Sequence, residues 1–245
     1  MRRLLCALLA TGALGGLASA PASADQAGVC EAAGGTWREH GQYPRQTEEP
    51  RCEFQESLSD DRSVGYSSPV PEDLLGDSWV QAQLAAFIKG RVAALRSSIS
   101  SAPQSTATAD IFEHQKYQHS ASVESLVFHE LANLGGAHPN DAYLTMTFDL
   151  AEHRELKISD LFKAGTNIQT TITPLVLRYA PKSGSLDQLS IGGGYNKGVY
   201  TTFALAPTEL IVYLPEARTG VVGAGAFTTH IPLAAFGDTL RPEYR

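Results

Sequence analysis

One long amphipathic helix followed by a series of strand-like segments is the feature that most constrains the fold of this chain. Over residues 79–99, apolar side chains recur every three or four positions, which predicts a helix with one buried face. Asp77 and Ser78 predict its N-terminal cap, and the Ser-rich stretch 97–108 predicts its end. Because the strand-like segments come later and do not alternate with helices, this order predicts an α+β fold.

The strand-like segments predict a largely antiparallel sheet, packed by this long helix and by shorter helices. Residues 142–150 alternate, with Leu144, Met146, Phe148 and Leu150 on one face and Tyr143, Thr145, Thr147 and Asp149 on the other. We expect the first face to be buried and the second to contact water. The other predicted elements are strands over 120–131, 155–158, 199–205, 210–214 and 227–231, a helix over 168–179 despite Pro174, and helical turns at 159–162 and 232–236.

Residues 1–24 show the three-part pattern of a secretory signal peptide. Arg2 and Arg3 precede an apolar run over 4–17, and small residues follow up to Ala24. We expect cleavage after Ala24 and a secreted or extracytoplasmic mature chain. The apolar run is too short to span a bilayer, and no later window is apolar over about 18 residues, so we expect no membrane span in the mature chain. We expect no lipid anchor at Cys6 either.

Cleavage of a signal peptide would remove Cys6 and leave Cys30 and Cys52 as a pair. Because exported proteins meet an oxidising environment, the pair predicts a disulfide. A metal-binding or reactive thiol pair would need closer spacing or histidine partners. Residues 25–60 are polar and weakly periodic, so we predict an N-terminal extension, a hairpin or loop stapled by this bond, ahead of an α+β domain over 61–245.

Charge and motif patterns exclude several functional classes. Lys and Arg number 19 against 26 Asp and Glu, a formal net charge of −7, which argues against a nucleic-acid partner. The seven histidines form no H-E-x-x-H or i, i+4 pair, so no metal site and no cofactor is predicted. Glu124 with Glu130 or Asp149 is compatible with two-carboxylate glycosidase chemistry, but solvated strand faces explain these residues better.

The segment Gly135-Gly136-Ala137-His138-Pro139-Asn140 is the first place to look for a binding site. Its two glycines permit a positive φ or a close backbone approach, and a histidine held before a rigid proline could bind or catalyse. The alternative is a plain turn in which His138 bonds a neighbouring carbonyl and Asn140 satisfies the turn. For a binding protein, we predict ligand contacts at Gly135, Gly136, His138, Asn140 and Tyr195, in loops whose backbone freedom suits recognition.

Four short motifs follow one another between residues 124 and 162. They are Glu124-Ser125-Leu126-Val127-Phe128, the Gly-Gly-Ala-His segment, Thr147-Phe148-Asp149-Leu150 and Leu156-Lys157-Ile158-Ser159-Asp160-Leu161-Phe162. Their order and spacing resemble the C-terminal domain family of the anti-sigma factor RsiV. The exported immunogenic proteins of mycobacteria belong to the same broad group, and this signal-bearing chain looks more like them than like membrane-tethered RsiV.

The resemblance implies an α+β fold, an extracytoplasmic setting and a precedent for binding a protein such as lysozyme. It does not imply regulation of a sigma factor, because the sequence shows no transmembrane helix or cytoplasmic segment of the RsiV type. We therefore predict a secreted, non-enzymatic protein that binds a protein or envelope ligand.

The alternative is a secreted carboxylester hydrolase, because some secreted mycobacterial relatives in the resembled group are labelled esterases. No G-x-S-x-G motif is present, so Ser125, His138 and Asp149 are the trio that such an enzyme would have to use.

Overall fold

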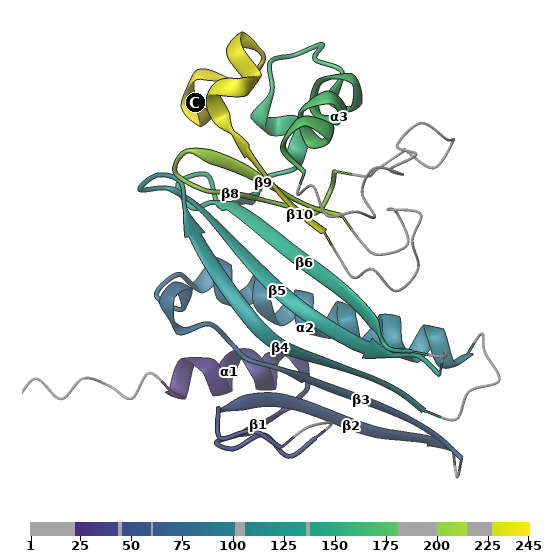
Figure 1. Ribbon diagram of the computed structural model, residues 1–245. Coiled ribbons are helices and arrows are strands. Elements are labelled where there is room, and N and C mark those ends of the chain that lie inside the picture. The colour runs from purple at the N-terminus through teal and green to yellow at the C-terminus, as the bar shows by residue number, and fades with distance from the viewer. Residues whose placement is uncertain are drawn as a thin grey trace, which may run out of the picture.

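The computed structural model describes residues 23–43, 46–59, 61–100, 106–135, 138–180, 200–214 and 227–245. Within these residues the strands form two sheets (Figure 1), a larger one with the order β1-β2-β3-β4-β5-β6-β7 and a smaller one with the order β10-β9-β8. Neighbouring strands are antiparallel except β3 and β4, which are parallel because helix α2 connects them. The predicted α+β fold with a largely antiparallel sheet is confirmed.

The elements have the following bounds. The strands are β1 Thr36–Arg38, β2 Arg51–Ser59, β3 Arg62–Ser68, β4 Thr106–Gln118, β5 Val123–Asn133, β6 Asn140–Asp149, β7 Arg154–Glu155, β8 Phe203–Leu205, β9 Glu209–Leu214 and β10 Phe227–Pro232. The α-helices are α1 Ser23–Ala33, α2 Ser78–Ser100 and α3 Ile168–Tyr179, and the 3-10 helices are η1 Glu72–Leu74, η2 Ile158–Leu161, η5 Leu233–Thr239 and η6 Pro242–Tyr244.

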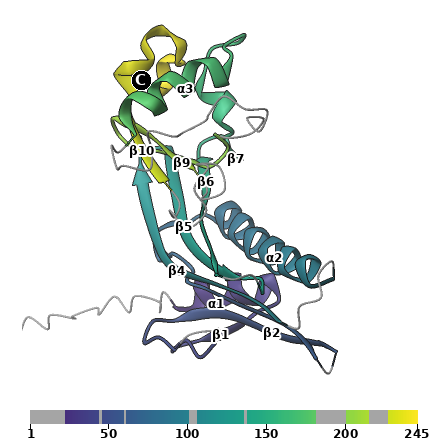
Figure 2. The same ribbon diagram turned by 45° about the vertical axis from the view of Figure 1, so that its right-hand side comes forward.

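Helix α2 forms where the sequence predicts it and lies along one face of the larger sheet (Figure 2). The side chain of Asp77 caps its first turn, with Oδ1 accepting from the backbone N–H of Trp79 at 2.8 Å. Six positions of the predicted apolar stripe are at most 2% exposed, and Phe87 is partly buried against the same core; the six are Val80, Leu84, Ile88, Val92, Leu95 and Ile99. This stripe packs with inward-facing residues of the strands in the main hydrophobic core.

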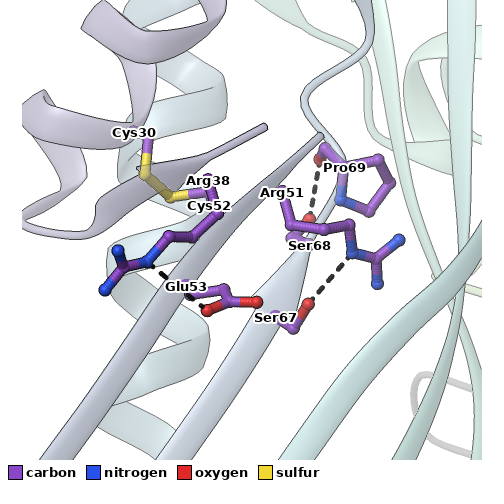
Figure 3. The surroundings of a disulfide bond; sticks show 8 residues. All are labelled: Cys30, Arg38, Arg51, Cys52, Glu53, Ser67, Ser68 and Pro69. Carbon is purple, nitrogen blue, oxygen red and sulfur yellow. Dashed lines mark hydrogen bonds and ion pairs between the residues drawn. A yellow bond between two sulfur atoms is a disulfide. The ribbon is translucent and has the colours of Figure 1, made fainter. Parts of the chain in front are cut away.

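The N-terminal segment joins the same core. The antiparallel pair β1–β2 lies in the segment for which the sequence predicts a hairpin or loop. Helix α1 is not predicted, because its buried positions include Gln26 and Cys30 and so show little apolar contrast. The predicted disulfide is confirmed: Cys30 of α1 bonds Cys52 of β2, and both residues are fully buried (Figure 3). The bond therefore fixes α1 to the strand that borders β3.

A polar network holds the chain on the other face of β2 and β3. The guanidinium of Arg51 is buried, forms an ion pair with Asp110 and donates from Nε to Ser67 Oγ at 3.0 Å. The carboxylate of Glu53 accepts from the backbone N–H of Tyr43 at 3.0 Å. A Cβ on Gly65 would come within 1.9 Å of the Tyr43 ring, so only glycine allows this close approach.

Strand β4 is a part of the sheet that the sequence does not predict. It pairs with β3 on one side and with β5 on the other, and it contains a register shift between Ile111 and Glu113. The buried positions end at this shift, so no regular alternation runs through the whole strand. Its second half is mostly exposed and polar, which also hides it from a hydrophobicity pattern.

The side of β6 that is predicted to contact water is partly covered in the structure. Thr147 is 2% exposed because the smaller sheet covers this end of β5 and β6 (Figure 1). Thr145 Oγ1 accepts from the backbone N–H of Phe203 at 3.0 Å, which ties β6 directly to β8. Alternation predicted the two faces of the strand correctly, but it carries no information about a second layer.

The C-terminal third follows the predicted pattern. Helix α3 spans residues 168–179 with Pro174 inside it, and the side chain of Asn167 caps it. Strands β8, β9 and β10 lie within or close to the predicted ranges, and η5 follows Pro232. Among the described residues, no helix is both long and apolar enough to cross a membrane.

Loss of the disulfide should destabilise the protein without changing its fold. The double variant Cys30→Ala with Cys52→Ala frees a loop of 22 residues in the unfolded chain, so we expect the free energy of unfolding to fall by about 3 kcal/mol. Urea denaturation of the purified protein measures this loss, and Ser57→Ala, at an exposed position of β2, is the control that should be neutral. Equal stability of the double variant and the unaltered protein would contradict the assignment.

Candidate functional site

The predicted binding loop forms the connection between β5 and β6. The last paired residues are Ala132 and Asn140. Gly135 has a φ of 77°, as a turn glycine should, and its N–H donates to Asn133 Oδ1 at 3.0 Å. His138 is exposed, with Nδ1 3.0 Å from the carbonyl oxygen of Pro139. The described part of the loop therefore has the hydrogen bonds of a turn, and it presents His138 and Asn140 to solvent.

Two predicted contact residues, Gly136 and Tyr195, lie outside the described residues. The predicted contacts that the structure describes are Gly135, His138 and Asn140, which gather at one tip of the larger sheet.

The structure does not bring Ser125, His138 and Asp149 together. Asp149 lies opposite Val123 at one end of β6, whereas His138 precedes Asn140 at the other end. At about 3.3 Å per residue, the length of this strand separates them by roughly 30 Å. No Ser-His-Asp triad can form from these three residues.

Ser125 instead connects the two sheets. It is fully buried, and its Oγ accepts from the backbone N–H of Leu205 at 2.9 Å and lies 2.9 Å from Thr147 Oγ1. The Leu205 bond gives a hydrogen-bond partner to a backbone N–H on the edge of β8 that faces away from β9. A hydroxyl held in this way is a structural group rather than an exposed nucleophile.

A row of four rings crosses the face of the larger sheet that is opposite α2. Phe112 and His129 have ring centroids 4.3 Å apart, His129 and Tyr143 are also 4.3 Å apart, and Tyr143 and Tyr213 are 4.6 Å apart. The rings come from β4, β5, β6 and β9, so the row links both sheets. We call these four residues the aromatic row.

His129 is the polar centre of the aromatic row. Its Nε2 lies 2.6 Å from Asp141 Oδ1, and its Nδ1 lies 3.8 Å from Glu113 Oε2. The imidazole is 16% exposed, whereas the carboxylates of Asp141 and Glu113 are 34% and 52% exposed, so the carboxylates contact solvent more than the ring does. The two carboxylates beside its ring nitrogens fix the orientation of the imidazole.

The tyrosines of the row are neutral hydrogen-bonding groups. Burial raises the pKa of Tyr213 well above its usual range, and the nearby hydroxyl of Tyr117 raises it further. Burial also raises the pKa of Tyr143, and the carboxylates of Asp141 and Glu113 act in the same direction. Neither phenol therefore supplies a tyrosinate nucleophile near neutral pH.

Exposed residues extend the row toward the loop tip. Leu131 is 43% exposed and lies two positions after His129, on the same face of β5. An exposed leucine beside half-buried aromatic rings and carboxylates offers both apolar contact and hydrogen bonding. We call this region the outer-face site, made of Phe112, Glu113, His129, Leu131, Asp141, Tyr143 and Tyr213.

The sequence analysis does not find the outer-face site, because its members come from four strands and only the register aligns them. His129 pairs with Tyr143 across β5 and β6, and with Glu113 across β4 and β5. The one local signal is the alternation that places Asp141 and Tyr143 on a common face. In the described part of the chain, no group of three or more His, Cys, Asp or Glu residues could hold a metal ion.

Comparison with known proteins supports the fold but does not establish an activity. No family model matches the chain. Over 124 residues the chain is 28% identical to an esterase of Mycobacterium tuberculosis, and the match covers 50% of this chain and 55% of that protein. The chain thus spans about half the length of this curated relative.

Two solved structures are similar. A DUF3298 family protein of Pseudomonas aeruginosa matches with a TM-score of 0.50 and 12% identity, over 79% of this chain and 94% of that one. A DUF3298 family protein of Bacteroides fragilis has a TM-score of 0.43 at 13% identity, over 79% and 93% of the two chains. The likeness to the Pseudomonas protein concerns the fold alone.

Removal of the Ser125 hydroxyl should destabilise the protein. In Ser125→Ala, the buried N–H of Leu205 loses its acceptor, so we expect the free energy of unfolding to fall by about 1–3 kcal/mol. Ser57→Ala, at an exposed position of β2, is the matched control and should change it by less than about 0.5 kcal/mol. Equal losses in both variants, measured by urea denaturation, would show that Ser125 does not connect the sheets.

Proposed function

We propose that this chain is an exported, non-enzymatic protein that binds a protein or envelope ligand on its outer-face site. The observation that carries the proposal is that the aromatic row and Leu131 lie on the outer face of the larger sheet, where β5 and β6 continue to the tip that carries His138 and Asn140. Tyr143, the exposed Leu131 and two carboxylates therefore share one surface, and tyrosine is enriched among the residues that dominate binding energy at protein interfaces. The predicted signal peptide and the disulfide support an extracytoplasmic location.

The resemblance of the sequence to the RsiV C-terminal-domain family suggests the first ligand to try. That family supplies a precedent for binding lysozyme, and the outer-face site carries the carboxylates of Glu113 and Asp141 toward solvent. Carboxylates at the rim of an interface steer an oppositely charged partner and fix its orientation. Lysozyme and purified peptidoglycan are therefore the two probes for this function.

The site can be tested with a matched pair of leucine variants. Leu131 and Leu177 are both exposed, at 43% and 54%, but Leu177 lies on α3, away from the outer-face site. Surface plasmon resonance first shows whether lysozyme or peptidoglycan binds the unaltered protein. We expect Leu131→Asp to weaken binding of that probe by about tenfold and Leu177→Asp to leave it unchanged. The proposal would be contradicted if neither probe binds, or if the two variants weaken binding equally.

A secreted esterase is the second candidate, because the relative from Mycobacterium tuberculosis carries that name. The His129–Asp141 pair has the His–carboxylate arrangement that orients a general base in serine hydrolases. Against this candidate, both nitrogens of His129 face carboxylates, and no described serine or threonine bonds to the ring.

Hydrolysis of p-nitrophenyl butyrate decides between the two candidates. We expect no turnover above buffer and no serine labelled by a fluorophosphonate, because the described residues contain no assembled nucleophile and base. Turnover that is abolished in His129→Ala or His138→Ala, together with one labelled serine in the mass spectrum, would identify an esterase and overturn the binding proposal.

A further inference from the structure

Strand β6 borders the larger sheet over most of its length (Figure 1). On one side it pairs with β5 from Asn140 to Asp149 without a register shift. On the other side, β7 pairs with it only at Phe148 and Asp149. In the part of the chain that the structure describes, β6 therefore has one open edge between Asn140 and Met146.

The backbone groups on this open edge belong to Asp141, Tyr143 and Thr145. Successive residues of an antiparallel strand direct their N–H and C=O groups to opposite edges. The carbonyl oxygen of Thr147 accepts from the N–H of Leu156 at 2.7 Å, so the odd-numbered residues of β6 direct these groups away from β5. Among the described residues, none bonds the outward N–H and C=O groups of the three residues.

The open edge lacks the features that keep edge strands apart. Proteins protect such edges with prolines, lysines or bulges, because an unpaired edge is a template for another strand. Strand β6 contains no proline, lysine or arginine, and no bulge interrupts its pairing with β5. The opposite border differs, because beyond the residues that β1 covers, β2 has a register shift between Ser57 and Ser59. The edge of β6 is therefore the one suited to accept a further strand.

This edge is complementary to itself. An antiparallel pair centred on Tyr143 places that residue opposite its own copy and Asp141 opposite Thr145, and each facing pair exchanges two hydrogen bonds. No like charges face each other, because Asp141 is the only charged residue between positions 140 and 148. The hydroxyl oxygen of Thr145 already accepts from Phe203, so its proton is available to the carboxylate of Asp141. A foreign strand would bond the same backbone groups, whereas a second copy also matches the side chains.

We propose that two copies of this chain associate through the open edges of β6 and form one continuous sheet. Facing residues of paired strands lie on the same face, so the outer faces of both copies are on one side of the dimer. Tyr143 is the β6 member of the aromatic row, and in the dimer it lies beside Tyr143 of the second copy. Each copy thus extends the outer-face site of the other. The dimer needs no ligand, so it does not rest on the function proposed above.

Sedimentation equilibrium of the purified protein without ligand measures this association. We expect a dimer with a dissociation constant of the order of micromolar, because a single strand pair is smaller than a standard interface. In Asp141→Pro, the lost N–H points away from β5, so the fold should remain while the dissociation constant rises about tenfold or more. Asp141→Ala loses the same carboxylate but keeps the N–H, and it should change the constant by less than about threefold.

Hydrogen exchange of the unaltered protein is an independent measurement, and it decides the matter if Asp141→Pro does not fold. We expect the amides of Asp141, Tyr143 and Thr145 to exchange more slowly as the protein concentration rises. A monomer at all concentrations up to about 1 mM, or equal dissociation constants of the two variants, would overturn the proposal. Equal protection of the three amides at every concentration would also overturn it, because another segment of the same chain would then cover the edge. Lysozyme or peptidoglycan binding by a monomer would reject the dimer alone.

Discussion

The hydroxyl groups that accept and donate hydrogen bonds at the edge of β8 determine how the two sheets combine. An edge strand presents unpaired backbone groups, which must find partners when they are buried. Here Ser125 and Thr145 accept from the N–H groups of Leu205 and Phe203, and Thr147 bonds both Ser125 and the carbonyl oxygen of Phe203. These bonds fix the smaller sheet over one end of β5 and β6. They leave Leu131, at the other end of β5, in contact with solvent.

The candidate site depends on this arrangement of the sheets. Tyr213 belongs to the smaller sheet, and it packs against Tyr143 of the larger one, so the aromatic row exists only when both sheets are in place. His129 in turn packs against Tyr143 and bonds Asp141. The site is therefore supported by packed rings and paired strands rather than by a loop, which favours a precise geometry for recognition.

The parts of the fold that could be predicted are those in which one segment carries its own signal. Helix α2 buries a regular apolar stripe, and Asp77 caps it as expected. The disulfide followed from Cys30 and Cys52, which remain as a pair once the predicted signal peptide is removed. Strand β4 was missed because its register shift after Ile111 interrupts the alternation. The covered face at Thr147 was missed because alternation within a strand does not reveal a second sheet.

The sequence by itself determined the α+β class, the long helix, the cysteine pair and most strand positions, because local periodicity and residue chemistry control these features. It also placed Gly135, His138 and Asn140 in one connection between strands. Only the tertiary structure decided that Ser125 is a buried link and that His138 and Asp149 lie at opposite ends of β6. The aromatic row around His129 was likewise a tertiary outcome. Strand register and sheet packing bring residues distant in sequence into contact, and neither leaves a signal within a single segment.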